Sequence, residues 1–205
     1  MNSPPSNPPL GPPPPSPALL AEIARVHADA ELLHDAAAVE AALARMAGEI
    51  AARLAERTPL VLTVPMGGIV PTGLLLPRLD FPLELDYCHA SRYRGQTSGA
   101  DLTWVRRPPE AVRGRSCLLI DDVLDEGLTL AALVAACQAA GAKEVLTAVL
   151  VEKRLARKPG GLAHADFVGL LADDRYLYGL GMDYKHFLRN APGIYAVRRP
   201  EERRP

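Results

Sequence analysis

The sequence has no long apolar run and almost no net charge. No stretch approaches about 18 uninterrupted apolar residues, so we expect no membrane-spanning helix. Lys and Arg number 23 against 24 Asp and Glu, which leaves a formal net charge of -1. A protein that coats nucleic acid needs a strongly basic surface, so neither nucleic acid nor a membrane is an expected partner. The start, Met1 to Leu10, lacks a basic segment followed by an apolar block, and we expect no secretory signal.

Cysteine is scarce, and neither cysteine nor histidine is grouped. Three cysteines occur without C-x-x-C or C-x-H spacing, which disfavours both a disulfide framework and a zinc site. The expected location is therefore the reducing cytoplasm. The histidines fit no metal or catalytic-triad spacing, and we assign them no role. The residues concerned are Cys88, Cys117, Cys137, His27, His34, His89, His164 and His186.

Proline is unevenly distributed and predicts the first boundary. Nine of the 20 prolines fall between Pro4 and Pro17, where each fixes φ and removes an amide donor. We therefore expect residues 1–17 to form a disordered tail, followed by one domain over 18–198 and a charged end over 199–205. A ligand for an SH3-type module is the alternative for the tail, but no basic anchor accompanies the prolines.

Residues 18–57 are rich in alanine and have a helical period. Asp35 stands where an N-cap belongs, directly before a helical run that begins at Ala36. One apolar stripe follows at steps of four, three, four and four residues, which is typical of a helix that covers one face of a sheet. Core packing explains this stripe better than a cofactor site does. The stripe consists of Val39, Leu43, Met46, Ile50 and Leu54.

Short apolar runs then alternate with helical patterns. This alternation predicts βαβ units and an α/β fold with a mostly parallel, doubly wound sheet. Ligands in such folds bind beyond the carboxyl ends of the strands. The expected strands are residues 60–64, 83–87, 116–120, 144–151 and 167–171. Helical patterns include 68–76 and 128–140, and Gly141 follows the latter as a C′ glycine.

The segment 116–131 carries the most specific signal. A buried strand leads into Asp121 and Asp122, then into a loop with Gly127, and then into a helix that begins near Thr129. The helix start offers free amides and a positive dipole end, which favour a phosphate. Adjacent carboxylates would repel a phosphate, but they suit sugar hydroxyls or Mg²⁺. The pattern therefore indicates a site for a sugar phosphate.

This segment resembles the 5-phosphoribosyl diphosphate (PRPP) signature of the type I phosphoribosyltransferases, and most closely the hypoxanthine-guanine members. The resemblance implies their fold, in which helices flank a central sheet and a small hood covers it, and it implies Mg²⁺ and a homodimer or homotetramer. It also assigns Asp121 and Asp122 to ribose and metal binding, and Asp125 to general-base catalysis. Glu126 stands where the family most often has Thr. The implied 5′-phosphate site consists of Asp125, Glu126, Gly127, Leu128 and Thr129.

Two other strand exits fit the same family. Met66 and Gly67, in a double-glycine turn, correspond to the pyrophosphate loop, although the family often has Lys where Met66 stands. The polar segment 90–103 is long enough for a mobile lid that excludes water, with a plain hairpin loop as the alternative. Its candidate residues are Ser91, Arg92 and Tyr93.

The C-terminal third resembles the purine-binding hood of these enzymes. Lys153 corresponds to the donor that selects a 6-oxo purine, because an ammonium can only donate. The hood is expected to come from 153–198, with a possible contribution from part of 18–35. The resemblance assigns purine binding to Lys153, Tyr176, Leu177 and Asp183, a second metal contact to Asp183, and pyrophosphate binding to Arg189.

The resemblance, which covers roughly residues 35–198, implies purine salvage. The reaction would transfer the phosphoribosyl group of PRPP to hypoxanthine or guanine, giving IMP or GMP and pyrophosphate. A xanthine- or uracil-specific enzyme is one alternative, although a pyrimidine enzyme would not need the lysine and aromatic of the hood. A non-catalytic nucleotide-sensing regulator is the other. Such a regulator would need a nucleic-acid surface, and the arginines of 198–204 are partly balanced by Glu201 and Glu202.

Overall fold

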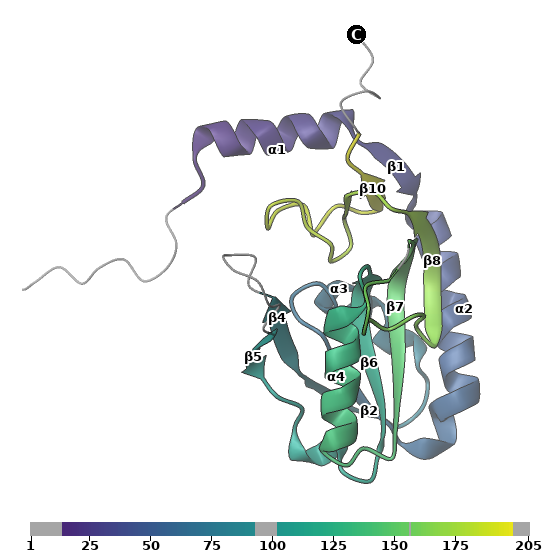
Figure 1. Cartoon of the computed structure of the whole chain (residues 1–205). Coiled ribbons are helices and arrows are strands. Elements are labelled where there is room, and N and C mark those ends of the chain that lie inside the picture. The colour runs from purple at the N-terminus through teal and green to yellow at the C-terminus, as the bar shows by residue number, and fades with distance from the viewer. Residues whose placement is uncertain (1–13, 93–101, 156, 199–205) are drawn as a thin grey trace, which may run out of the picture.

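The computed structural model describes residues 14–92, 102–155 and 157–198 and has a five-stranded parallel sheet at its centre (Figure 1). The strand order is β3-β2-β6-β7-β8, so the two longest strands lie beside each other in the middle. These strands are β2 (Leu60–Thr63), β3 (Glu84–Tyr87), β6 (Ser116–Leu124), β7 (Glu144–Arg154) and β8 (Phe167–Asp173). The predicted α/β class with a mostly parallel sheet is confirmed.

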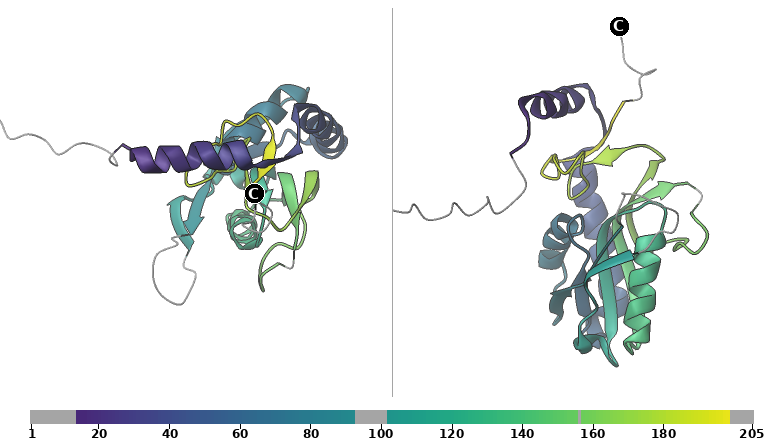
Figure 2. Two further views of the ribbon diagram at one scale, coloured as in Figure 1. Left: turned by 90° about the horizontal axis from the view of Figure 1, so that it is seen from above. Right: turned by 60° about the vertical axis from the view of Figure 1, so that its left-hand side comes forward.

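Helices cover both faces of this sheet, because alternate strand side chains supply two separate cores. On one face, α2 (Ala36–Leu54) buries its apolar stripe against Leu118 and Ile120 of β6. On the other, α4 (Leu128–Ala139) packs against Cys117 and Leu119 of the same strand. The views in Figures 1 and 2 show α2 and α4 on opposite sides of the sheet. The short helix α3 (Ile69–Leu75) joins β2 to β3.

The predicted start of α2 is confirmed. The Asp35 side chain accepts a hydrogen bond from the amide of Ala38 at 2.9 Å, which satisfies one of the free donors of the first helical turn. The helical period assigned to 18–57 is wrong in one place, because residues 31–34 form strand β1 (Glu31–His34) between α1 (Pro17–Asp29) and α2. Helix α1 begins within the segment expected to be tail, with Ser16 as its N-cap.

A second sheet, which we call the hood sheet, brings the two ends of the chain together. Its antiparallel order is β1-β10-β9, with β9 (Leu177–Tyr178) and β10 (Ile194–Ala196). Helix α1 lies across it at the top of Figure 1. Tyr178 stacks on Tyr195 at a centroid distance of 5.3 Å, and the His27 ring of α1 contacts both tyrosines. The hood sheet thus depends on residues from both ends of the chain.

The polar segment 90–103 begins and ends in an antiparallel hairpin. Strands β4 (His89–Arg92) and β5 (Leu102–Arg106) pair so that Ser91 lies opposite Thr103. The candidate lid residues Ser91 and Arg92 therefore lie on a strand, and Tyr93 lies outside the described residues. The same holds for most of the proline-rich tail and for the charged C-terminal end.

Among the described ranges, no helix is long and apolar enough to cross a membrane.

Candidate active site

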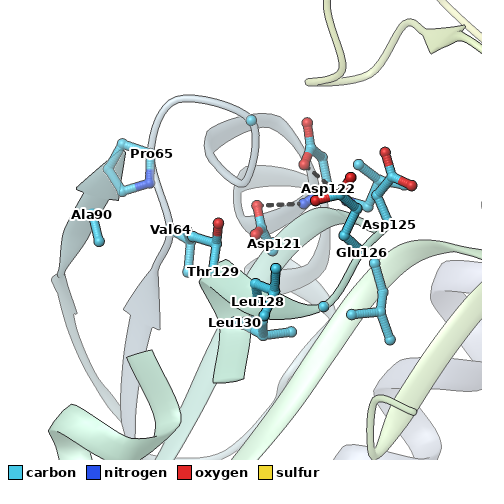
Figure 3. Close-up of a pocket in the computed structure, with 14 residues that line it drawn as sticks. Val64, Pro65, Ala90, Asp121, Asp122, Asp125, Glu126, Leu128, Thr129 and Leu130 are labelled. Atoms are coloured by element: carbon cyan, nitrogen blue, oxygen red, sulfur yellow. Dashed lines mark hydrogen bonds between the residues drawn. The ribbon is translucent and has the colours of Figure 1, made fainter. Parts of the chain in front are cut away.

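The first pocket, which we call the β6 pocket, lies where β6 leads into α4. It has a volume of about 260 Å³. Gly127 adopts a left-handed φ of +81°, and this turns the chain into α4 at Leu128. Figure 3 shows Pro65 and Ala90 on one side of the pocket and Asp125 and Glu126 on the other. A helix N-terminus is thus exposed to a cavity, as the sequence predicts.

Two adjacent carboxylates form the floor of the β6 pocket. They lie within β6, just before its end, because the strand continues to Leu124 instead of ending at Ile120 as expected. An Asp121 oxygen accepts the amide of Asp122 at 2.9 Å, drawn as a dashed line in Figure 3, and Asp122 accepts the amide of Val123 at 2.8 Å. Burial raises the pKa of both carboxyls, and the Asp122 charge raises that of Asp121 further.

The turn between β2 and α3 closes against this acid pair. A Cβ on Gly67 would lie 2.0 Å from the nearer carboxylate oxygen of Asp122, so any other residue here would displace the Asp122 side chain. A Cβ on Gly68 would lie 2.5 Å from the carbonyl of Ile120. The peptide bond between Pro65 and Met66 is cis, and the Met66 side chain is 57% exposed. The double glycine therefore brings this backbone directly to the carboxylates.

A second pocket, the hood pocket, adjoins the first. Its volume is about 210 Å³, and it shares Asp122, Val123 and Asp125 with the β6 pocket. Its other lining residues come from β7 and from the hood: Lys153, Tyr176, Leu177, Met182 and Asp183. The two pockets are therefore separated only by the end of β6 and the residues that follow it.

Lys153 lines the hood pocket and contacts Asp125, which borders both pockets. Strand β7 extends beyond the predicted end at Val151 and places Lys153 within the strand, where it is 9% exposed. Its Nζ lies 3.1 Å from Oδ2 of Asp125 and 3.5 Å from Oδ1 of Asp174. A buried ammonium thus contacts the carboxylate at the boundary between the pockets.

Tyr176 is held in the hood pocket by a chain of contacts that reaches α1. Its ring packs edge-on against Tyr184 at a centroid distance of 5.5 Å. The Tyr184 hydroxyl donates to Oε1 of Glu22 on α1 at 2.7 Å, and this bond raises the pKa of Tyr184. Tyr176 itself is 48% exposed and lines the hood pocket.

Arg189 and Asp183 join the hood to the turn at Gly67. Nη2 of Arg189 lies 2.7 Å from Oδ1 of Asp183, and the Arg189 charge lowers the pKa of Asp122 against the effect of burial. Gly181 has a φ of +112°, and a Cβ there would lie 2.2 Å from the carbonyl oxygen of Gly67. The guanidinium, the Asp183 carboxylate and the β2–α3 turn therefore lie at one edge of the site.

The structure brings most of the predicted site residues to these two pockets. Glu126 lines the β6 pocket, and its carboxylate forms an ion pair with Lys158 at 2.8 Å. Sequence reasoning missed Val123 and Met182, which supply apolar walls of the hood pocket. Val123 directly follows the two aspartates of the β6 motif, and this position could have identified it. No local sequence pattern identifies Met182.

A comparison with family models matches residues 29–166 to the phosphoribosyl transferase domain. The chain belongs to the phosphoribosyltransferase family. It is 31% identical over 150 residues to the hypoxanthine-guanine phosphoribosyltransferase of Bacillus subtilis, covering 73% of this chain and 82% of that one. It is 33% identical over 154 residues to the bifunctional protein TilS/HprT of Listeria innocua, covering 75% of this chain but only 23% of that longer protein.

The phosphoribosyltransferase fold is also found among solved structures. The hypoxanthine phosphoribosyltransferase of Staphylococcus aureus superposes with a TM-score of 0.78 at 22% identity, covering 85% of this chain and 95% of that one. The predicted type I fold, with a parallel sheet and a small additional sheet, is therefore confirmed.

The carboxylates of this phosphoribosyltransferase fit Mg²⁺ only as a cation shared with substrate. Within the described ranges, no group of three or more His, Cys, Asp or Glu residues could hold a metal on its own. Mg²⁺ usually keeps several waters and binds one or two carboxylates together with substrate phosphates. Asp121 and Asp122, and separately Asp183, provide such partial sets of carboxylate ligands at the two pockets.

Asp121→Asn is expected to raise the melting temperature of the phosphoribosyltransferase at pH 7. A raised carboxyl pKa means that the folded state binds the proton more tightly than the unfolded state, so ionisation near neutrality lowers stability. The amide oxygen of Asn can still accept the amide of Asp122. Thermal unfolding without Mg²⁺ measures the gain, which should shrink as the pH falls and the wild-type carboxyl is protonated.

Exposed Asp80 provides the matched control, and Asp80→Asn should leave the melting temperature unchanged. A lower melting temperature for Asp121→Asn would show that its charge stabilises the fold.

Proposed function

We propose that the protein is a 6-oxopurine phosphoribosyltransferase that converts hypoxanthine or guanine, with PRPP, into the nucleoside 5′-monophosphate and pyrophosphate. The observation that carries this proposal is the contact between Lys153 and Asp125 on the wall shared by the two pockets. One pocket has the chemistry of a sugar phosphate site, and the other has the chemistry of a purine site. Lys153 can donate a hydrogen bond to the purine, and Asp125, which borders both pockets, can accept its proton.

The β6 pocket is proposed to hold the ribose 5-phosphate part. The amides of 127–129 and the Thr129 hydroxyl face the 5′-phosphate at the positive end of α4. The carboxylates of Asp121 and Asp122 accept hydrogen bonds from the ribose hydroxyls. They also favour the positive charge that develops on the sugar as the bond to pyrophosphate breaks.

The hood pocket is proposed to hold the purine. Tyr176 stacks on one face of the ring, and Val123 lies on the wall that the two pockets share. Leu177 contributes backbone groups at the ring edge. Lys153 donates to the 6-oxo group, and it has no acceptor to offer the 6-amino group of adenine.

The pyrophosphate is proposed to leave along the edge formed by the β2–α3 turn and Arg189. The amides of Met66 and Gly67 donate to it, and the guanidinium of Arg189 stabilises its charge. Mg²⁺, when bound through Asp121, Asp122 or Asp183, would neutralise part of the charge on the leaving pyrophosphate. Ser91 and Arg92, at the end of β4, are proposed to begin a lid that excludes water.

Asp125 is proposed to act as the general base. Its carboxylate accepts the proton at N7 of the purine, which makes N9 a stronger nucleophile. N9 then forms a bond to C1′ of the ribose, and the bond from C1′ to the pyrophosphate oxygen breaks. The Lys153 ammonium holds the Asp125 carboxylate at the wall where the base must lie.

Incubation with PRPP, Mg²⁺ and one free base at a time tests this function. We expect formation of nucleoside 5′-monophosphate, followed by absorbance, with hypoxanthine and guanine and not with adenine or uracil. If only xanthine or only uracil is converted, the protein is instead specific for that base, and the proposed substrates are wrong. Binding of a nucleotide with no turnover of any base would favour the non-catalytic regulator.

Lys153→Met is expected to lower kcat/KM for hypoxanthine and guanine by about 10²- to 10³-fold, since it leaves a buried 6-oxo group without its donor. Methionine preserves the length of the side chain and removes the charge. Steady-state kinetics with each base measure the effect. Lys143→Met, an exposed change at the other end of β7, is the control and should retain wild-type kinetics. Equal kinetics in both variants would contradict the contact with the purine.

A further inference from the structure

The connection between β7 and β8 lies directly against the loop that precedes α4. The amide of Leu162 donates to the carbonyl of Gly127 at 3.0 Å. A Cβ on Gly127 would lie 2.5 Å from the carbonyl oxygen of Leu162, and a Cβ on Gly161 would lie 2.4 Å from that of Glu126. Two glycines, one on each segment, allow this close backbone contact. The described part of this connection is thus packed against the proposed phosphate loop.

Arg157 is the side chain that links this connection to both pockets. Its Nη1 donates to the carbonyl of Asp125 at 2.8 Å and to the carbonyl of Lys153 at 3.0 Å. Its Nε donates to the carbonyl of Ala163 at 3.1 Å. One guanidinium therefore fixes the backbone of the proposed general base relative to the backbone of the proposed purine donor.

The positive charge of Arg157 is balanced by a neighbouring buried carboxylate. Its side chain is 11% exposed, and its Nη2 lies 3.2 Å from Oε1 of Glu152, whose side chain is 8% exposed. Glu152 also accepts the amide of Ala165 at 3.2 Å and contacts Nδ1 of His164 at 2.8 Å. Only arginine offers a planar fork that can serve three carbonyls and a carboxylate at once, since lysine has a single nitrogen.

We infer that Arg157 is a positioning residue of the reaction. It does not lie among the residues that line either pocket, so it acts through Asp125 and Lys153. By holding both carbonyls, it keeps the Asp125 carboxylate at the distance from Lys153 that a bound purine requires. The inference rests on the proposed function, because it assigns Arg157 a task in that same site.

Arg157→Lys tests the inference, since it keeps the charge beside Glu152 and loses the fork. Misplacing a reacting group by about 1 Å costs on the order of 100-fold, so we expect kcat to fall by about 10- to 100-fold. The dissociation constant of the nucleoside 5′-monophosphate should rise by about 10-fold, because the loop that binds its phosphate moves. A variant that merely folds less completely would lose apparent kcat, but its folded fraction would keep the wild-type dissociation constant and KM.

Arg154→Lys is the matched control, since Arg154 lies three residues away, is exposed and pairs only loosely with Asp173 at 3.6 Å. It should match the wild type. Should Arg157→Lys fold poorly, the double variant Glu152→Gln, Arg157→Gln removes both buried charges and is judged by the same two constants. If whichever Arg157 variant folds has the wild-type kcat and the wild-type dissociation constant for the nucleotide, the positioning role of Arg157 is wrong. The proposed function would remain intact. A wild-type protein that turns over no base would instead overturn the proposed function.

Discussion

Asp125→Asn is expected to lower kcat by about 10²- to 10⁴-fold, the range that general-base catalysis contributes. Asparagine has the size of aspartate and can still accept from Lys153, but its amide cannot take up a proton from N7. Nucleotide binding should change far less than turnover, because the amides and the hydroxyl that are proposed to bind the phosphate are untouched. Steady-state kinetics, together with the dissociation constant of the nucleoside 5′-monophosphate, separate the two effects.

Asp174→Asn is the control for this variant. Asp174 also contacts Lys153, at 3.5 Å, but its side chain is 65% exposed and it does not line the hood pocket. Its replacement should leave kcat within about threefold of the wild type, as for most changes to exposed ion pairs. Near-normal turnover in Asp125→Asn would eliminate the general-base role, and an equal loss in both variants would assign the effect to Lys153.

Gly127→Ala is expected to lower both the free energy of unfolding and nucleotide affinity. At φ +81° a non-glycine residue costs about 1–3 kcal/mol, and the added Cβ would also meet the Leu162 carbonyl at 2.5 Å. Relief of that contact must displace either the proposed phosphate loop or the connection between β7 and β8 that packs on it. Urea unfolding should show a loss of at least about 2 kcal/mol. The nucleoside 5′-monophosphate should bind at least 10-fold more weakly, which corresponds to about 1.4 kcal/mol.

Gly48→Ala is the control for Gly127→Ala, because it makes the same change at a glycine with no such constraint. Gly48 lies inside α2, and nothing lies within 4 Å of the place where its Cβ would be. Alanine there should raise the free energy of unfolding by about 0.5–1 kcal/mol through its higher helix propensity. If Gly127→Ala were as stable as the wild type and bound nucleotide equally well, the close contact with Leu162 would have no energetic role.

The sequence predicts those helices and strands that depend on local patterns of residues. The N-cap Asp35, the stripe of α2 and the core strands follow from period and burial, and all of them are present. Strand β1 could not be predicted, since it exists only by pairing with β10 more than 150 residues away. The ends of β6 and β7 were placed too early for a similar reason. Charged side chains follow directly, Asp121 and Asp122 after Ile120 and residues 152–154 after Val151. Pairing nevertheless continues the ladder, between Val123 and Val151 in β6 and β7 and between Arg154 and Asp173 in β7 and β8.

The site residues likewise fall into those that the sequence predicts and those that it does not. Motif residues such as Asp121, Gly127 and Lys153 could be placed because their chemistry and their position after a strand coincide. Arg157 could not, because it acts on backbone carbonyls, which every residue has and which no sequence pattern identifies. Met182 is apolar and buried, and in the sequence it looks like any core residue. Only the folded chain shows that it borders a cavity.

The thin partition between the two pockets has a consequence for ligand design. Because Val123, Asp122 and Asp125 border both pockets, one compact molecule that carries the proposed purine and phosphate groups on a short linker should fill both at once. Tethering converts the second contact into an intramolecular event, so such a molecule gains avidity over its separate halves without any new interaction. The linker length that gives the tightest complex would then measure the thickness of the partition in solution.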